Sequence, residues 1–377
     1  MPNRKKLYFD DVFADGVLLH TFNRATFGGA AIGECLIAAS KVDEKDTESW
    51  WRAWSEQGRQ AESVAETARA RDHRVTAKNA YLRAMTYHYN AHYALRPTDP
   101  RYVPAVEHFR SLFRKFAALS PRPIEAIEIP YEGKTLPGYF LRPDASGTPR
   151  PTLVGGDVIA EELYFWVAPG GLERDYNILL VDLPGIGLNP HHGIHFRPDT
   201  EVGVGACVDW LYERGDVDAS RIAFYGGGPG GWVAVRAATY EERIAACVAD
   251  PFVPDTDGVM GFFSRPEYDS KDVSQHTLAF SAVEQVAVFY GGEDRKGYPK
   301  LTAEPEKLRC PLLCMSDPGD SDAVRAECDR AVATAPHPAN VHRVLTPEDG
   351  TTFLRAADNF ILKQGVMYDW LDEVLIA

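Results

Sequence analysis

The 377-residue sequence lacks the features that mark several large classes of protein. No run approaches the roughly 18 consecutive apolar residues that a membrane-spanning helix needs. The basic cluster near the N-terminus continues into acidic residues instead of the apolar stretch of a signal peptide. Positive charge is scarce, since 40 basic against 54 acidic residues give a formal net charge of -14, which argues against a nucleic-acid backbone or an anionic membrane as partner. We therefore expect a cytoplasmic protein that binds neither nucleic acid nor membrane.

Paired metal-binding or disulfide-forming patterns are also missing. The six cysteines are scattered, mostly in apolar runs, without C-x-x-C spacing, which indicates buried free thiols. The histidine cluster His191, His192 and His195 lies on a glycine-containing loop and lacks the helical spacing and flanking carboxylate of a zinc site. We expect these histidines to pack the loop or, alternatively, to contact a substrate. No phosphate loop appears, and Gly185-Ile-Gly187 is too short for a dinucleotide fingerprint, so the sequence predicts no metal and no cofactor.

Residues 1–120 carry helical signals and almost no strand signal. Good helix formers follow Asp46 and continue to Arg71. In 76–95, aromatic residues, alanines and the histidines His88 and His92 recur at spacings of three and four, so they share one face of a helix. A further amphipathic helix is expected over 99–119. The sequence thus predicts an N-terminal helical cap domain, 1–120.

After the proline-rich link Ser120–Pro123, β-like runs alternate with helical ones. The first two runs read as a hairpin, and the later ones are short and apolar, which is typical of a parallel sheet covered on both faces. The fold class is therefore α/β, a mostly parallel sheet with helices on both faces, over 121–377, with an inserted flap at about 252–307. The eight expected strands are 124–131, 135–142, 151–154, 176–182, 221–225, 245–249, 311–315 and 342–345.

The most informative stretch is 222–238, where an apolar run enters a glycine-dense turn and leaves as an alanine-rich helical run. This is the strand, sharp turn and helix of a nucleophile elbow, whose usual pattern is G-x-S-x-G. The register places Gly226 and Gly230 on its two glycines and Gly228 on its serine. Glycine cannot attack a carbonyl, and Pro229 lacks the backbone N–H that usually stabilises the oxyanion.

Further motifs occur in a fixed order around this turn: Gly155–Glu162, Val181–Gly187, Phe196–Asp199, Arg221–Gly226, Arg243–Asp250 and Asp369–Leu371. With them the chain resembles the FrsA-like (esterase 2 or DUF1100) group of α/β-hydrolases, which includes 2,6-dihydroxypseudooxynicotine hydrolase and fungal polyketide-shortening C-C hydrolases. The helices around Ala80–Ala84 also resemble the cap of that group, so the resemblance covers nearly the whole chain. It implies an α/β-hydrolase fold, a small-molecule substrate, a homodimer and a Ser-Asp-His triad.

The sequence departs from that triad at two of its three positions. Gly228 stands for the serine, and the loop in which the histidine is expected contains Phe353 but no histidine, because none follows His342. For the acid, Asp317, Asp320 and Asp322 are candidates, of which Asp320 fits the spacing best. We interpret Gly228, Asp320 and Phe353 as a vestigial triad. The double loss favours a natural departure from acyl-enzyme chemistry over an engineered Gly228.

Other residues remain as candidates for chemistry. Asp157 follows the turn Gly155-Gly156, whose N–H groups can polarise a carbonyl. Burial there would raise the pKa of Asp157 and favour an acid or base role. Alternatively, Asp157 caps the following helix through Glu161. His88 and His92 on the cap helix are further catalytic candidates, with packed core residues as the alternative. Asp250 could reach the pocket or pin the loop that begins at Pro251. The predicted substrate-binding residues are Gly156, Tyr87, Pro229, Trp232 and Asp250.

These features favour an enzyme without a nucleophile that performs non-hydrolytic acid/base chemistry. Cyclase, dehydratase, isomerase and C-C lyase reactions on a ketone-bearing aromatic or polyketide-like molecule of secondary metabolism all suit such a pocket, the substrate class following from the resemblance alone. One alternative is a catalytically silent protein that binds small molecules. Another is a hydrolase whose water is activated directly by Asp157 or a cap histidine.

Overall fold

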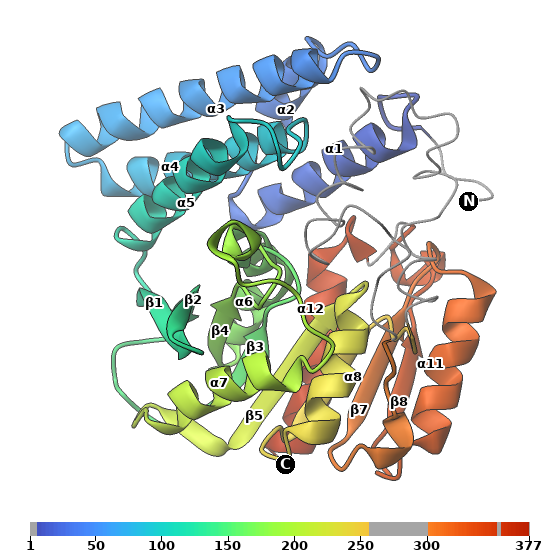
Figure 1. Ribbon diagram of the computed structural model, residues 1–377. Coiled ribbons are helices and arrows are strands. Elements are labelled where there is room, and N and C mark those ends of the chain that lie inside the picture. The colour runs from blue at the N-terminus through green and yellow to red at the C-terminus, as the bar shows by residue number, and fades with distance from the viewer. Residues whose placement is uncertain (1–5, 256–300, 353–355, 377) are drawn as a thin grey trace. The chain divides into compact units, whose positions relative to one another are not determined.

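The computed structural model describes residues 6–255, 301–352 and 356–376. The described chain forms two compact units that divide after Pro121, within the proline-rich link. The first unit is helical, and the second is built on one large sheet (Figure 1).

The N-terminal unit contains helices and short turns of helix and no strand among its described residues. Asp11 and Asp46 begin two of the helices, because their side chains accept hydrogen bonds from the N–H groups of Ala14 (2.7 Å) and Glu48 (2.9 Å). The predicted helical region is therefore present. Its elements are α1 (Val12–Arg24), η1 (Ala25–Phe27), α2 (Ile32–Ala39), α3 (Thr47–Ala70), α4 (Arg74–His92) and α5 (Tyr102–Ala117).

Aromatic side chains from α3 and α4 form the centre of this unit, where the two helices lie side by side (Figure 1). The rings of Trp50 and Trp54 are 5.6 Å apart, and the Trp54 ring lies 5.9 Å from that of Tyr87. The Trp50 Nε1–H donates to the carbonyl of Asn90 at 2.8 Å, so the indole is buried with its polar atom satisfied.

The second unit contains an eight-stranded sheet in the order β1-β2-β4-β3-β5-β6-β7-β8. β1 pairs antiparallel with β2, and β2 pairs antiparallel with β4, whereas all later pairs are parallel. Every strand expected from the sequence is present, and the predicted fold class is confirmed. The strands are β1 (Ile124–Tyr131), β2 (Lys134–Leu141), β3 (Arg150–Gly155), β4 (Asn177–Val181), β5 (Val217–Gly227), β6 (Ala246–Asp250), β7 (Leu312–Ser316) and β8 (Val341–Val344).

Helices cover both faces of the sheet, as Figure 1 shows. On one face α6 (Ala160–Glu173) packs against α12 (Phe360–Leu375), where Gln364 accepts from the Gly170 N–H at 2.6 Å and donates to the Phe165 carbonyl at 2.9 Å. On the other, α7 (Glu201–Tyr212) meets α8 (Gly230–Tyr240), joined by an ion pair between Glu201 and Arg236 at 2.8 Å. The remaining elements of this unit are η2 (Asn189–His192), η5 (Pro305–Lys307), α11 (Asp322–Thr334) and η6 (Pro347–Asp349).

The expected flap at 252–307 lies mostly outside the described residues. At its two ends the chain comes together, since Asp255 forms an antiparallel bridge with Thr302. The described residues on either side of 256–300 therefore lie next to each other.

All six cysteines are free and buried, as the sequence indicates. Burial raises the pKa of Cys35, Cys207 and Cys310 to about 12, and raises the pKa of Cys247 and Cys314 well above the ordinary thiol value. These thiols therefore remain protonated near neutral pH.

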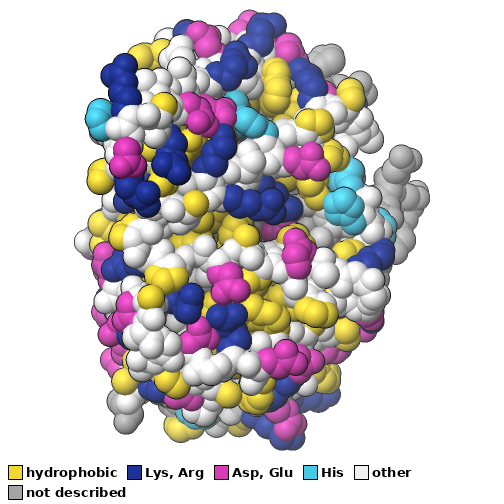
Figure 2. All heavy atoms as spheres, turned by 90° about the vertical axis from the view of Figure 1, so that its left-hand side faces the viewer, with side chains coloured by type: hydrophobic (Ala, Val, Ile, Leu, Met, Phe, Trp, Pro, Cys, Tyr) yellow, Lys and Arg dark blue, Asp and Glu magenta, His cyan; other side chains and the backbone are white. Residues whose placement is uncertain are grey.

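The surface in Figure 2 mixes Lys and Arg side chains with Asp and Glu side chains. The net charge of -14 is thus not gathered into one acidic field on this face. No helix within the described parts of the chain is both long and apolar enough to cross a membrane.

Candidate functional site

The expected strand, turn and helix is formed by the end of β5, the residues Gly228 and Pro229, and the start of α8. Two of its glycines are required by close contacts. A Cβ at Gly226 would lie 1.9 Å from the carbonyl oxygen of Gly230, and one at Gly231 would lie 2.0 Å from that of Pro251. Only residues without a side chain allow α8 to start so close to the strand.

Gly228 occupies the position that the sequence pattern gives to a nucleophile. Its φ of 58° lies in the left-handed region, as the sharp turn of an elbow requires. Its N–H donates to the carbonyl oxygen of Asp250 at 2.6 Å. Pro229 follows with no N–H to offer. Neither a side chain of residue 228 nor the backbone N–H of residue 229 can therefore act on a carbonyl here.

Asp157, after the end of β3, lies directly against this turn. Its Oδ2 accepts a hydrogen bond from the Gly227 N–H at 2.9 Å, and a Cβ at Gly230 would be only 2.2 Å from the Asp157 Cβ. The N-cap position of α6 is Ile159, and it makes no side-chain capping bond. The first N–H of α6, that of Ala160, donates to Asp182 at 2.9 Å, and Glu161 instead accepts from the Tyr139 hydroxyl at 2.6 Å.

A pocket opens beside the turn at the carboxyl edge of the sheet, where ligands of such sheets bind. Four of the predicted site residues, Gly156, Asp157, Pro229 and Trp232, line it together. Its wall is mostly apolar with few polar side chains, as in many small-molecule sites. The N-terminus of α8, which favours negative charge, reaches it at Gly230. The other lining residues are Leu183, Pro184, Ile186, Phe196, Arg197, Thr200, Gly230 and Val233.

Arg197 is a pocket residue that the sequence reasoning missed. Its guanidinium donates twice to Asp199, at 2.7 Å each, once to Glu132 at 2.7 Å and once to the Tyr131 hydroxyl at 3.1 Å. The Asp199 carboxylate, followed by the Tyr131 hydroxyl, raises the pKa of Arg197 above its ordinary value, so the group is a permanent cation. The motif Phe196–Asp199 was noticed for the family resemblance but was not considered as part of a site.

Asp250 is not among the residues that line the pocket. Its side chain is 4% exposed, accepts from the Tyr225 hydroxyl at 2.8 Å and forms an ion pair with the fully buried Lys363 of α12. Lys363 also donates to the Tyr225 hydroxyl at 2.7 Å. The structure favours the alternative in which Asp250 holds the local backbone, since its carbonyl also fixes Gly228.

Among the acids after β7, the structure gives Asp317 the position that the sequence analysis assigned to Asp320. Asp320 is buried and accepts from the Asp317 N–H at 3.0 Å. Asp317 is the acid that reaches the later loop, because its Oδ2 accepts from the Ala356 N–H at 3.1 Å. Burial and the carboxylates of Asp320 and Asp250 raise the pKa of Asp317 well above its ordinary value. Phe353 lies outside the described residues, so its place in a vestigial triad stays a prediction.

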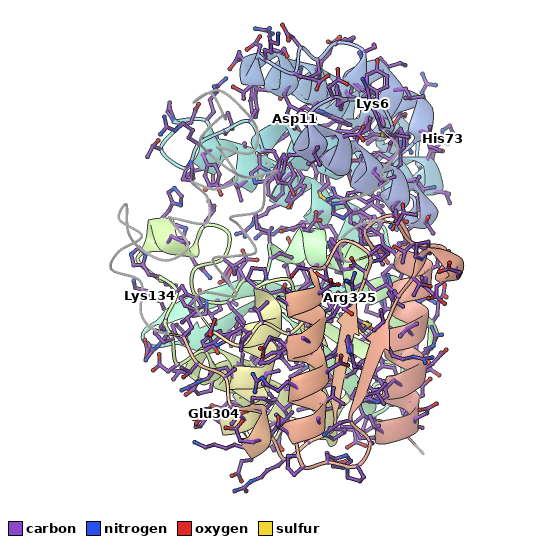
Figure 3. All side chains as sticks on the ribbon, turned by 90° about the vertical axis from the view of Figure 1, so that its right-hand side faces the viewer. Lys6, Asp11, His73, Lys134, Glu304 and Arg325 are labelled. Carbon is purple, nitrogen blue, oxygen red and sulfur yellow. The ribbon has the colours of Figure 1, made fainter. Side chains whose placement is uncertain are left out.

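The third acid, Asp322, is exposed and pairs with Arg325 on α11 at 2.9 Å. Arg325, labelled in Figure 3, also donates to the backbone carbonyl of Asp317 at 2.9 Å. Asp322 therefore lies on the surface, and Asp317 and Asp320 are the two buried acids of the three.

His342, the last histidine of the chain, has its two ring nitrogens in hydrogen bonds with residues outside the turn. Its Nε2 lies 2.8 Å from the Ser316 Oγ, and its Nδ1 lies 2.7 Å from Asp329. These are the bonds of a catalytic triad, but the exposure is reversed, because Ser316 is 1% exposed and the Asp329 side chain is 73% exposed. A nucleophile must be reachable. The three residues therefore clamp α11 to the sheet.

Two of the three cap residues predicted for the site are packed inside the helical unit. The Tyr87 hydroxyl donates to Glu34 at 2.6 Å and accepts from the Ala31 N–H at 2.9 Å. His92 is 1% exposed and bonds to the Tyr89 carbonyl, with its ring against Tyr89 and other aromatic rings. For both residues the structure favours the packed alternative.

The loop that carries His191, His192 and His195 is fixed through its backbone. Lys134, labelled in Figure 3, donates to the carbonyls of His192 (2.8 Å) and Gly193 (3.0 Å). All three histidines are exposed.

Comparisons with known proteins agree with this architecture. The family described as Esterase FrsA-like matches residues 44–255. The α/β hydrolase gkaG of Penicillium citrinum is 38% identical over 253 residues, which are 63% of this chain and 59% of that protein. The 20-hydroxy-prefusarin hydrolase FUS2 of Gibberella moniliformis is 34% identical over 258 residues, 65% of this chain and 61% of that protein. The chain thus spans about three fifths of the length of these relatives.

Among solved structures, 2,6-dihydroxy-pseudo-oxynicotine hydrolase superposes with a TM-score of 0.69 at 21% identity, covering 94% of this chain and 96% of that one. This likeness shows a shared fold, whereas membership of the family rests on the sequence matches. Together with the sheet order and the elbow, they show that this chain belongs to the FrsA-like esterase family of α/β hydrolases.

Proposed function

We propose that this protein is an α/β-hydrolase-fold enzyme that works without a serine nucleophile and performs acid/base chemistry on a ketone-bearing aromatic or polyketide-like molecule. One observation carries the proposal: Gly228 and Pro229 form the turn of the elbow, while the Asp157 carboxylate is hydrogen-bonded to that turn in the wall of the pocket. Asp157 can move a proton, whereas Gly228, at the nucleophile position, has no side chain that could form an acyl-enzyme.

The proposed role of Asp157 is that of general base toward a carbon next to a carbonyl. Removing that proton gives an enolate, whose negative charge needs stabilisation in a largely apolar pocket. The N-terminus of α8 borders the same pocket and favours such a charge. Arg197 also borders it, with its own charge paired to Asp199 and Glu132. Cyclisation, dehydration, isomerisation and C-C cleavage can all proceed from an enolate, so the reaction class is set by the substrate.

The substrate class rests on the relatives. Their names describe hydrolases, one acting on 20-hydroxy-prefusarin and one on 2,6-dihydroxy-pseudo-oxynicotine. We transfer only the coarse chemistry that these names print, a small molecule bearing hydroxyl groups, and not the hydrolysis, because residue 228 has no side chain.

The test measures proton exchange at carbon. 1-Phenylpropan-2-one and 2-tetralone are incubated with the full chain in D₂O, and deuterium uptake beside the carbonyl is followed by NMR. We expect uptake above the buffer rate, and Asp157→Asn to lower the enzyme-dependent rate about 10²- to 10⁴-fold. Asp175→Asn is the control, since Asp175 is an exposed residue with a φ of 63° that asparagine also adopts.

Two outcomes would overturn the proposal. Saturable binding of either ketone with no exchange above buffer would identify a silent binding protein. Hydrolysis of 4-nitrophenyl butyrate by the unmodified chain, with no pre-steady-state burst of 4-nitrophenol and with loss of the activity in Asp157→Asn, would identify a hydrolase with directly activated water.

A further inference from the structure

The helical unit contains a cluster of metal-ligand side chains that the sequence did not bring to notice. Glu62 on α3, His88 on α4 and His108 on α5 each present one ligand atom, and these atoms all lie within 4.8 Å of one another. The His108 Nε2 is 3.1 Å from the Glu62 Oε2, and the His88 Nε2 is 3.9 Å from the same oxygen. The two imidazole rings are nearly perpendicular, at 87°, with centroids 4.5 Å apart.

The packing around His88 leaves space for its ring at one helix crossing. A Cβ at Gly58 on α3 would lie 2.6 Å from the His88 Cδ2 and 2.7 Å from its Nε2, so any other residue would displace the ring. His88 is 9% exposed, and its buried Nε2 has no hydrogen-bond partner among the residues that the structure describes. A buried polar nitrogen in this state is unfavourable, and a bound ligand would satisfy it.

We propose that Glu62, His88 and His108 form a binding site for a divalent transition-metal ion, with Zn²⁺ as the first choice. Zinc binds imidazole nitrogen and carboxylate oxygen at about 2.0–2.2 Å, so neighbouring ligands of a tetrahedral ion lie roughly 3.4 Å apart. The separations of 3.1 and 3.9 Å lie on either side of this distance. Two imidazoles with one carboxylate suit zinc better than magnesium or calcium, which prefer oxygen ligands.

Metal binding requires a change at His108. A metal ion binds the unprotonated nitrogen of an imidazole, so His108, whose Nε2–H donates to Glu62, would bind the ion as its Nδ1–H tautomer. The His108 side chain is 41% exposed, which leaves a route to the site from solvent.

Two neighbouring cations, Lys115 and Arg59, oppose the ion. The Lys115 ammonium lies 3.6 Å from the Glu62 Oε1, but it lies closer, at 2.6 Å, to the exposed carboxylate of Glu66. Lys115 therefore has a second partner when a cation occupies the cluster. With three protein ligands, the ion would keep an open position, as catalytic zinc sites do. This inference stands independently of the proposed acid/base function.

The experiment uses the full chain, stripped with a chelator and titrated with ZnCl₂ by isothermal calorimetry. We expect one ion per chain and at least about a tenfold weaker affinity in Glu62→Gln, His88→Ala and His108→Ala, in line with losses seen when metal sites are disturbed. Bound Co²⁺ provides a second readout, because a tetrahedral site gives intense visible absorption that the variants would lose. His73→Ala, at the exposed N-cap of α4 (Figure 3), and His191→Ala are the controls.

The outcome can contradict the site in two ways. Absence of stoichiometric binding, or binding that survives in Glu62→Gln and His108→Ala, would overturn it. Binding that is lost in His191→Ala instead would place the ion on the exposed histidine loop. Glu62→Gln keeps the shape of the side chain, so a result remains available if His88→Ala does not fold.

Discussion

Replacing Lys363 by methionine should destabilise the second unit strongly. Lys363 is fully buried, and its ion-pair partner Asp250 is 2% exposed. Methionine fills nearly the same space, so the change removes charge with little change in packing. What remains is the buried Asp250 carboxylate, whose side chain accepts a hydrogen bond from the Tyr225 hydroxyl.

The magnitude follows from that burial. Removing one partner of a buried ion pair costs about 3–5 kcal/mol, because the other charge stays out of water. Lys363 also lies 4.1 Å from the ring centroid of Trp166, and losing this cation–π contact adds about 1–2 kcal/mol. A domain is stable by about 5–15 kcal/mol, so we expect a loss of roughly a third or more of the total.

Urea unfolding followed by circular dichroism, at pH 7, measures the effect in a double-mutant cycle. Lys363→Met, Asp250→Asn and the double variant are compared, and we expect a coupling free energy of at least about 2 kcal/mol. Arg174→Met is the matched control, because its pair with the exposed Asp369 should contribute less than about 1 kcal/mol. A cost for Lys363→Met no larger than that of the control, or strictly additive changes, would refute the reasoning and return Asp250 to the list of substrate contacts.

Three further predictions concern the elbow and the acid behind it. Gly230→Ala should cost about 1–3 kcal/mol in urea unfolding, because its Cβ would meet Asp157 at 2.2 Å; Gly33→Ala, with open space around it, is the control and should be near neutral. Gly228→Ser should cost about 1 kcal/mol at a φ of 58° and give no hydrolysis of 4-nitrophenyl butyrate, whereas appearance of that activity in this single variant would show that a base already reaches the turn. For Asp317 the raised pKa means that the native state holds a proton that the unfolded chain releases. The stability of the wild type relative to Asp317→Asn should therefore fall as pH rises from about 4 to 7, by up to about 1.4 kcal/mol per pH unit, and a constant difference would contradict the assignment.

The strands could be predicted because each is an apolar run bounded by turn residues. The first matches residue for residue, at Ile124–Tyr131, since alternating side chains and the Glu132-Gly133 turn define both of its ends. β5 begins earlier than expected, at Val217. Its first residues include the polar Asp218 and Ser220, so they lack the apolar pattern of a buried strand. At this end the pairing with β3 is irregular, with a register shift between Arg150 and Thr152.

The part of the site that could be predicted lies next to the strand ends in the sequence. Gly156, Asp157 and Pro229 all follow a strand within a few residues, so the topology of a parallel sheet brings them to one edge. Lys363 could not be assigned in this way, because its partner Asp250 is far away in the chain. The same holds for the Glu62 cluster, whose ligands come from three different helices without a shared motif.

The buried thiols have a practical consequence for solution work. Because all six cysteines are inaccessible and five of them have a raised pKa, a cysteine introduced on the surface would be the fast-reacting thiol of the folded protein. A fluorophore or spin label could then be attached at exposed Ile37 or Ile361 without first removing the native cysteines. Distances between such labels on the two units would report directly on their arrangement in solution, with and without ligand.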